Sequence, residues 1–173
     1  YEFVNKIVGG AIPKEYIHAV EKGFREGLSN GPLGGYPIES LKVTLLDGST
    51  HPVDSDALSF EIAAKIALKE ASRNASPVLL EPLMRAEVIT PEEYMGDVIA
   101  DFNRRRGQIL GTESKGITGV VKALVPLAET FGYVTVLRTI TSGRAVSNME
   151  VAQYEKVPEE VAEKIFHSFL FRF

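Results

Sequence analysis

The sequence predicts an α+β protein of two small domains, and three observations lead to this fold class. Stretches with the two-residue period of β-strands alternate with stretches of helical period. A short, polar, proline-terminated segment from Asn74 to Pro77 interrupts this series. After it, the predicted order is strand, helix, strand, strand, helix, strand and a final helix. We therefore expect one domain over residues 1–75 and a second over residues 76–173.

The first domain is predicted to contain two strands, each followed by a helix. Residues 1–8 form the end of a strand, and Pro13 suits the first turn of the helix that follows. Residues 41–45 alternate as a second strand. The small residues that form a ridge along the first helix are Ala19, Gly23 and Gly27. Such a ridge permits another element to pack closely against it.

The second helix of this domain is predicted to run to about Arg73. Asp54 or Ser55 is a good N-cap, because a short polar side chain accepts a hydrogen bond from a free backbone N–H of the first turn. We expect Glu61 and Lys65 on the outer side of this helix. The larger apolar residues expected on its inner side are Leu58, Ile62 and Ile66.

The second domain is predicted to begin with a strand that leads into a capped helix. Residues 81–88 alternate in the manner of a half-buried strand. The Thr90 hydroxyl is expected to cap the helix, with Pro91 at its first position and Gly107 as its stop. The apolar stripe of this helix comprises Tyr94, Met95, Val98, Ile99 and Phe102.

The rest of the second domain completes the series. Strands are predicted over residues 108–114, 117–125 and 145–154. Between the last two, residues 127–141 are rich in β-branched side chains, which favour a strand. The spacing of the apolar residues and the stop at Ser142-Gly143 indicate a helix instead. The resulting β-α-β-β-α-β order is that of the ferredoxin-like fold.

Composition limits the functions that this chain can have. Its 173 residues carry a net charge of −4 and no cysteine, which excludes disulfides and thiolate metal sites. Lys and Arg number eight against ten Asp and Glu up to residue 75, and 11 against 13 after it, so each part carries −2. A general nucleic-acid binder is usually basic, so any RNA contact must come from local clusters. No apolar run is long enough for a membrane span.

Catalysis by this chain is not expected. The three histidines are scattered, and no spacing suggests a nucleophile beside a base or a set of metal ligands. The phosphate-loop pattern G-x-x-x-x-G-K-[ST] does not occur, so the chain does not bind GTP by that route.

Three consecutive arginines, Arg104, Arg105 and Arg106, have two interpretations. Cations at a helix C-terminus interact favourably with the helix dipole, so a solvated helix end is the simpler one. A guanidinium group also presents a planar fork of donors to phosphate oxygens, so the alternative is a phosphate-facing cluster. Composition leaves both open.

Several motifs are similar to those of one family. E-P-L-M-R-A-E-V, P-E-E-Y-M-G-D-V and N-R-R-R-G, all within residues 81–107, resemble the start of the last domain of translation elongation factor G. V-P-L-A-E-T-F-G-Y at residues 125–133 resembles a later part of the same domain. G-G-A-I-P-K-E-Y-I at 9–17, G-P-L-G-G-Y-P at 31–37 and H-P-V-D-S-D-A-L-S-F at 51–60 resemble the fourth domain. The chain thus resembles most of domain IV followed by domain V.

This resemblance implies a fold and an activity. The first domain is expected to be a partial ribosomal protein S5 domain 2-like fold without its opening strands, and the second a ferredoxin-like fold; both are small α/β sandwiches. The chain would be the C-terminal arm of a translational GTPase that promotes ribosomal translocation of tRNA and mRNA, contacting the A site through domain IV. The implied setting is a cytoplasmic monomer whose partner is the ribosome, with its rRNA, tRNA and mRNA, and no membrane. GTP and Mg²⁺ belong to a G domain missing from this sequence. The chain itself is therefore expected to hold no cofactor or metal and to be no enzyme, although its parent would be a GTPase.

The resemblance also gives roles to particular residues. His51 and Pro52 match the tip of domain IV, which lies beside tRNA and mRNA, whereas the residues alone indicate only a histidine in a surface loop. Asp54 and Ser55 are expected to support this tip as helix caps. The arginines at 104–106 are assigned contacts with large-subunit rRNA.

Two alternatives remain open. Pro52 departs from the family pattern H-[DE]-V-D-S, which leaves room for a paralogue that uses the same domains in ribosome recycling or ribosome protection. An unrelated ferredoxin-like interaction module is the third interpretation, and the long ungapped motifs disfavour it.

Overall fold

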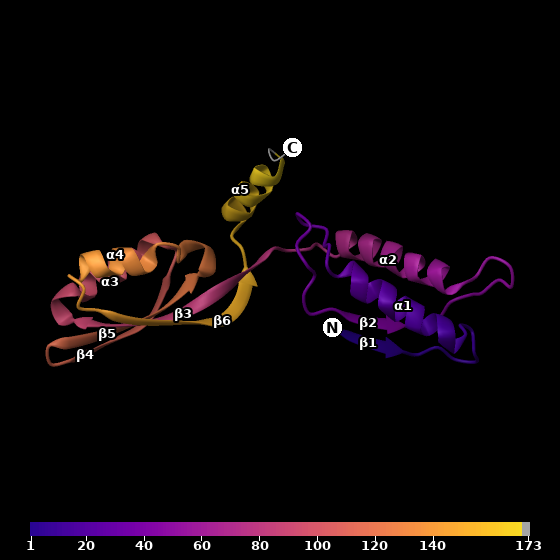
Figure 1. Cartoon of the computed structure of the whole chain (residues 1–173), viewed down its shortest axis with the longest axis horizontal. Coiled ribbons are helices and arrows are strands. Elements are labelled where there is room, and N and C mark those ends of the chain that lie inside the picture. Colours follow the sequence, from indigo (N-terminus) through magenta and orange to yellow (C-terminus); the bar gives the residue numbers. More distant parts are fainter. Residues whose placement is uncertain (171–173) are drawn as a thin grey trace. The chain divides into compact units, whose positions relative to one another are not determined.

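The computed structural model of the protein describes residues 1–170 and divides into two compact units. Unit 1 contains Tyr1–Val78 together with residues 162–170, and unit 2 contains Leu79–Val161. Each unit has its own sheet and helices (Figure 1), so the predicted α+β class with two small sheet-containing domains is confirmed. The final helix, α5 (Glu159–Leu170), starts in unit 2 and continues in unit 1, whereas the sequence placed it entirely in the second domain.

Unit 1 is built on two parallel strands, each followed by a helix. The strands are β1 (Glu2–Asn5) and β2 (Lys42–Leu45), which are hydrogen-bonded to each other. The helices are α1 (Lys14–Gly27) and α2 (Ala57–Asn74).

The helices α1 and α2 pack closely because the glycines of α1 leave room for α2. A side chain at Gly23 would lie 2.4 Å from the backbone oxygen of Glu61 and 2.8 Å from Cβ of Ala64. A side chain at Gly27 would lie 2.7 Å from Cδ2 of Leu68. The predicted ridge of small residues is therefore confirmed as a site of close helix packing.

The face of α2 that was expected to be buried is exposed. Its apolar residues on that side, each about half exposed or more, are Leu58, Ile62 and Ile66. The Glu61 side chain instead faces α1, and its carboxylate accepts hydrogen bonds from Lys22 of α1 and from Lys65 of α2, each at 3.1 Å. The prediction was wrong because the face of α2 that packs against α1 is the one that carries Ala64 and Leu68, which lie over the glycines of α1.

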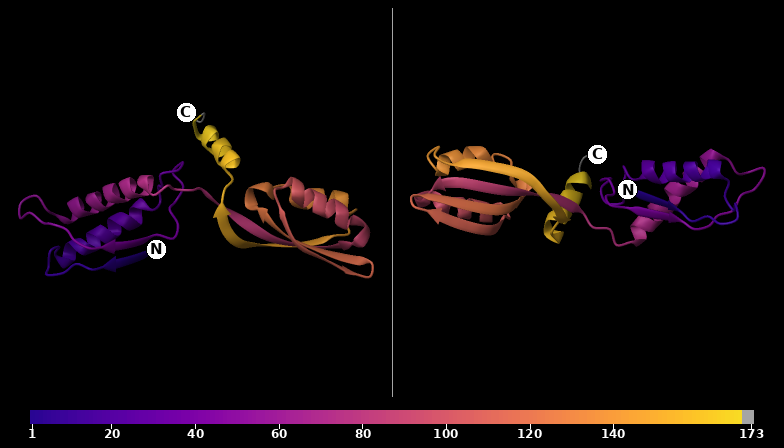
Figure 2. Two further views of the ribbon diagram at one scale, coloured as in Figure 1. Left: turned by 180° about the vertical axis from the view of Figure 1, so that it is seen from behind. Right: turned by 90° about the horizontal axis from the view of Figure 1, so that it is seen from below.

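Unit 2 is a four-stranded antiparallel sheet in the order β4-β5-β3-β6. Its elements are β3 (Leu80–Pro91), α3 (Met95–Arg104), β4 (Gln108–Lys115), β5 (Thr118–Pro126), α4 (Tyr133–Ile140) and β6 (Val146–Lys156). Short 3-10 turns, Glu92–Tyr94 and Leu127–Glu129, precede the two helices. The views in Figure 2 place α3 and α4 on the same face of the sheet. This order and layering confirm the ferredoxin-like prediction.

The core of unit 2 lies between that face and the two helices. The buried residues that form it are Ala86, Val88, Val98, Phe102, Val121, Ala123, Val125, Tyr133 and Leu137. The rings of Phe102 and Tyr133 stack with their centroids 5.4 Å apart, which joins α3 to α4. The sequence stripe of α3 is confirmed by the complete burial of Val98 and Phe102.

The predicted cap at Thr90 is wrong. The strand β3 continues through Thr90, which pairs with Gly119 of β5, and its hydroxyl is buried without a hydrogen-bond partner. The ladder holds this residue in the sheet until Pro91, so the chain leaves the strand through a 3-10 turn rather than through a capped first turn of helix.

Candidate functional site

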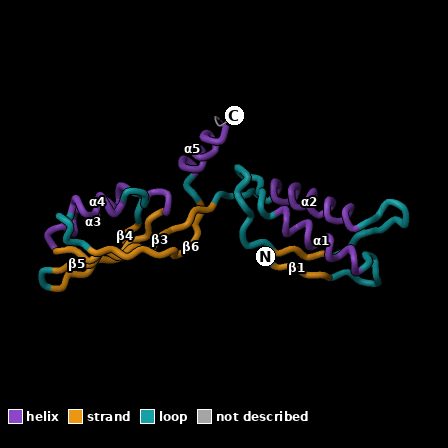
Figure 3. Tube along the Cα trace, in the orientation of Figure 1, coloured by secondary structure: helices purple, strands orange, loops and turns teal. Residues whose placement is uncertain are grey.

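Two loops lie together at one end of unit 1, because a parallel pairing brings the C-terminal ends of β1 and β2 side by side (Figure 3). One loop, residues 6–13, leads into α1, and the other, residues 46–56, leads into α2. A side chain at Gly48 would lie 2.4 Å from Cδ1 of buried Ile12, so the two loops are in direct contact. We call this pair of loops the tip.

Within the tip, residues 51–55 form a closed turn, the tip turn. The backbone N–H of His51 donates to Oγ of Ser55 at 2.8 Å, and the backbone N–H of Ser55 donates to the carbonyl oxygen of His51 at 3.1 Å. All four residues from His51 to Asp54 are exposed, and Val53 is 92% exposed. The predicted tip residues His51 and Pro52 therefore lie on a short turn that faces solvent.

The tip turn is anchored to α1 through its last residue. The carbonyl oxygen of Ser55 accepts a hydrogen bond from the Tyr16 hydroxyl at 3.3 Å. The Tyr16 ring in turn stacks on Phe60 of α2, with centroids 5.0 Å apart and an interplanar angle of 15°. The base of the turn is thus fixed between two helices, while its apex is free of them.

The N-cap of α2 is Asp56, so the prediction of Asp54 or Ser55 was wrong. Oδ1 of Asp56 accepts hydrogen bonds from the backbone N–H and the hydroxyl of Ser59, at 2.7 and 2.6 Å. These bonds, that of the Ser59 hydroxyl first, hold the pKa of the Asp56 carboxyl below its usual value. Ser55 cannot cap as well, because its hydroxyl already closes the tip turn.

The tip turn presents hydrogen-bonding groups to solvent. The imidazole of His51 offers one N–H donor and one acceptor to a partner, and no partner for its side chain occurs within residues 1–170. In that same part of the chain no cluster of His, Asp and Glu could hold a metal ion. The exposed imidazole of His51 can therefore form hydrogen bonds with a polar partner.

The second candidate, residues 104–106 or the arginine turn, uses its charges differently. Nε of Arg105 donates to Oδ2 of buried Asp101 at 2.9 Å, and Nη1 donates to the carbonyl oxygen of Glu129 at 2.6 Å. The same guanidinium group lies 5.1 Å from the centroid of the Tyr133 ring. Arg105 therefore ties α3 to the residues that lead into α4.

Arg106 is also engaged within unit 2. Nη1 and Nη2 donate to the two carboxylate oxygens of Glu81 at 2.9 and 3.0 Å, and Nε donates to Glu129 at 3.2 Å. The bidentate bond to Glu81 is the main cause that raises the pKa of Arg106. The backbone of Arg106 has a φ of +57°, a left-handed conformation that glycine usually adopts at a helix end. Gly107 follows it and donates to the Phe102 carbonyl at 2.8 Å, which completes the helix stop.

Arg104 remains accessible to a partner. Its side chain is 70% exposed, and its nearest acid, Asp101, is 3.7 Å away. The structure brings the three arginines together, as the sequence requires, but only Arg104 presents its guanidinium to solvent.

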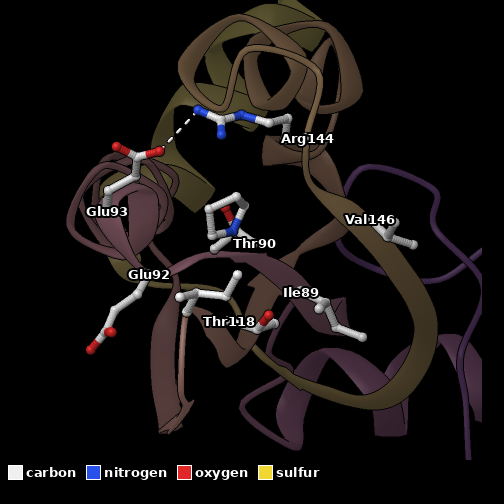
Figure 4. A pocket seen from close by; sticks show the side chains of 9 residues that line it. Ile89, Thr90, Glu92, Glu93, Thr118, Arg144 and Val146 are labelled. Carbon is white, nitrogen blue, oxygen red and sulfur yellow. Dashed lines mark hydrogen bonds and ion pairs between the residues drawn. The ribbon is translucent and has the colours of Figure 1, made fainter.

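Unit 2 also has a hollow of about 510 Å³ that sequence reasoning missed (Figure 4). The residues lining it are Ile89, Thr90, Pro91, Glu92, Glu93, Ile117, Thr118, Arg144 and Val146. Arg144 pairs with Glu93 at 2.9 Å and lies 4.9 Å from the Tyr94 ring centroid. These residues come from the end of β3 and the 3-10 turn after it, from the start of β5 and from the start of β6, and no local motif links them. The hollow contains no nucleophile beside a base.

The unit with the tip and the ferredoxin-like unit together define a two-domain α+β module. Comparison with known proteins gives the family. The family model "Elongation factor G, domain IV" matches residues 1–76, and "Elongation factor G C-terminus" matches residues 78–165. The chain belongs to the elongation factor G family.

Individual relatives agree with this assignment. The chain is 57% identical over 164 residues to elongation factor G of Amoebophilus asiaticus (strain 5a2), covering 95% of this chain and 23% of that protein. It is 58% identical over 165 residues to elongation factor G of Fervidobacterium nodosum, covering 95% of this chain and 24% of that protein. A crystal structure from Thermus thermophilus has a TM-score of 0.91 and 41% identity, covering all of this chain and 26% of that one. The chain thus spans about a quarter of the length of these relatives.

Proposed function

We propose that this chain serves as the C-terminal arm of a translation elongation factor and promotes the movement of tRNA and mRNA on the ribosome. The observation that carries the proposal is the exposed tip turn, which lies within the segment matched by elongation factor G domain IV. In this proposal His51 contacts the RNA in the ribosomal A site, and Pro52 restricts the backbone beside it.

The chain acts as a mechanical and RNA-contacting element in this proposal. GTP and Mg²⁺ bind elsewhere in the full-length factor, which works as a monomer in the cytoplasm. Within residues 1–170 no helix has the length and apolar character needed to cross a membrane. Because GTP is bound elsewhere in the factor, a substitution in the tip can slow translocation without slowing GTP hydrolysis.

The test is His51→Ala in the full-length factor that carries this chain. We expect slower translocation with nearly unchanged GTP hydrolysis. The loss of one hydrogen bond to a charged group costs about 1–3 kcal/mol, and thus slows the step that uses it about tenfold or more. Pre-steady-state translocation and GTPase rates, measured side by side, give the result.

His18→Ala is the matched control. His18 is also an exposed histidine of unit 1, but it lies on α1 rather than in the tip. It should translocate at the wild-type rate, and thermal melts of both variants should match the wild type. Equal loss of translocation and hydrolysis in His51→Ala, or loss of neither, would contradict the proposal.

A second function is favoured by one residue. Pro52 stands where the family pattern has an acid, which suits a paralogue that acts in ribosome recycling or ribosome protection. Subunit splitting measured beside translocation separates these roles, because a recycling factor splits ribosomes and does not translocate.

A further inference from the structure

We infer that Ser55 is the positioning residue of the tip: it holds the backbone of His51 in place and acts on the partner only through His51. This inference rests on the proposed function, because it assumes that His51 makes the contact. It does not follow from a capping role, since the cap of α2 is Asp56.

The first argument is the pair of hydrogen bonds between the two residues. The Ser55 hydroxyl accepts from the His51 N–H at 2.8 Å, and the Ser55 N–H donates to the His51 carbonyl at 3.1 Å. Both backbone polar groups of His51 are therefore satisfied by one residue. Of the two, the bond to the hydroxyl is the one that truncation of the side chain to alanine removes, while the backbone bond is kept.

The second argument is the difference between the two ends of the turn. Ser55 is half-buried, and its carbonyl oxygen accepts from Tyr16, whose ring stacks on Phe60. His51 is exposed, and its side chain has no partner in the described part of the chain. The helices therefore hold Ser55, and Ser55 holds the backbone of His51. The His51 side chain does not hold the turn.

The third argument is entropic. An exposed turn without this closure would move among several backbone conformations, and His51 would have to be ordered each time it met its partner. A partner that binds one conformation binds more weakly in proportion to the fraction of time that this conformation is present. Holding the turn closed removes that loss before contact occurs.

The experiment compares Ser55→Ala and Ser55→Thr in the full-length factor. Ser55→Ala removes the acceptor, so we expect translocation to slow about three- to tenfold, with GTP hydrolysis unchanged. Ser55→Thr keeps a hydroxyl oxygen at the same place and should restore translocation to near the wild-type rate. Ser59→Ala is the control, because it removes a hydroxyl from the first turn of α2 without touching the tip turn.

Two further readouts separate positioning from a general structural role. Hydrogen–deuterium exchange of peptides that contain residues 50–56 should speed up in Ser55→Ala and not in Ser59→Ala. The double variant His51→Ala/Ser55→Ala should translocate no more slowly than His51→Ala, because residues that act through each other are not additive.

The outcomes are distinct. Wild-type translocation or unchanged exchange in Ser55→Ala overturns the positioning role while leaving the proposed function intact, and so does an additive double variant. A Ser55→Thr variant as slow as Ser55→Ala also overturns it. If His51→Ala itself translocates normally, the proposed function fails and the positioning role fails with it.

Discussion

The tip turn and the arginine turn were both expected to contact RNA, yet they use their polar groups in opposite ways. In the tip turn, the backbone bonds to itself and the side chain of His51 is left for a partner. In the arginine turn, Arg105 and Arg106 donate to Asp101, Glu81 and Glu129 of their own unit. A run of charge in a sequence therefore does not mark a binding surface until the fold has placed the acids that can neutralise it.

The physical difference lies in desolvation. A partly buried guanidinium group has lost part of its hydration, and an ion pair with a carboxylate from a neighbouring strand offsets that cost. An exposed imidazole has water as its partner and can exchange it for a phosphate or a ribose at little cost. We therefore expect the arginine turn to contribute to stability, and we propose that the tip turn contributes to recognition. The predictions below test this division, from the largest expected effect on folding to the smallest.

Arg106→Ala should lower the free energy of unfolding by about 2 kcal/mol, because it leaves the poorly exposed Glu81 carboxylate without its bidentate partner. Urea denaturation of the 173-residue chain measures the change. Arg106→Gly is the matched variant. It loses the same ion pairs but accepts the left-handed backbone at about 1 kcal/mol less strain, so it should be the more stable of the two. Wild-type stability in both variants would mean that Arg106 is free for RNA after all.

Asp56→Ala should have a smaller effect that depends on pH. The hydrogen bonds from Ser59 lower the pKa of Asp56 in the folded chain. The stabilisation is therefore complete above the ordinary carboxyl pKa of about 3.9 and is lost as the pH falls through the lowered value. Thermal melts at neutral pH should show the variant below the wild type, and the two should converge in acid. A constant difference down to acidic pH would rule out the ionised cap.

Arg104→Ala should have the smallest effect on folding, within about 0.5 kcal/mol, because its side chain is largely exposed. If Arg104 meets an RNA phosphate, the variant binds ribosomes more weakly, and the salt dependence of its affinity falls by about one unit of slope. Binding titrations at several salt concentrations measure this. An unchanged slope would leave the arginine turn with a structural role alone.

Local patterns predicted the elements well where one physical preference dominated. The ferredoxin-like order was predicted from the two-residue period of the strands and from the apolar stripe of α3. In the structure Val98 and Phe102 of that stripe are fully buried. The spacing of apolar residues in α4 outweighed its β-branched composition, since burial of Tyr133 and Leu137 against the sheet favours a helix there. The ridge of Gly23 and Gly27 was recognisable because glycines in a helix need a packing reason.

Prediction from the sequence failed where neighbouring residues can take the same role, and where residues distant in sequence determine the structure. Asp54, Ser55 and Asp56 are all residue types that cap helices well. Only the structure shows that the Ser55 hydroxyl accepts from His51 in the tip turn, and that Asp56 is the N-cap of α2. Thr90 resembled a cap because the pairing with β5 that keeps it in the sheet involves residues almost 30 positions away. The partners of Arg106, Glu81 and Glu129, are equally remote in sequence, and no local spacing predicts them.

The parallel pairing of β1 and β2 has an electrostatic consequence for the tip. Because both strands end there, both α1 and α2 begin there. Aligned peptide groups give each helix a positive N-terminal end equivalent to about half an elementary charge. Asp56 offsets this charge at α2 as its cap, and at α1, which begins after Pro13 and has no side-chain cap, Glu15 lies in the first turn. The backbone therefore contributes two partial positive charges to the tip of a segment, residues 1–75, whose side chains sum to −2, and these charges come from the orientation of peptide groups.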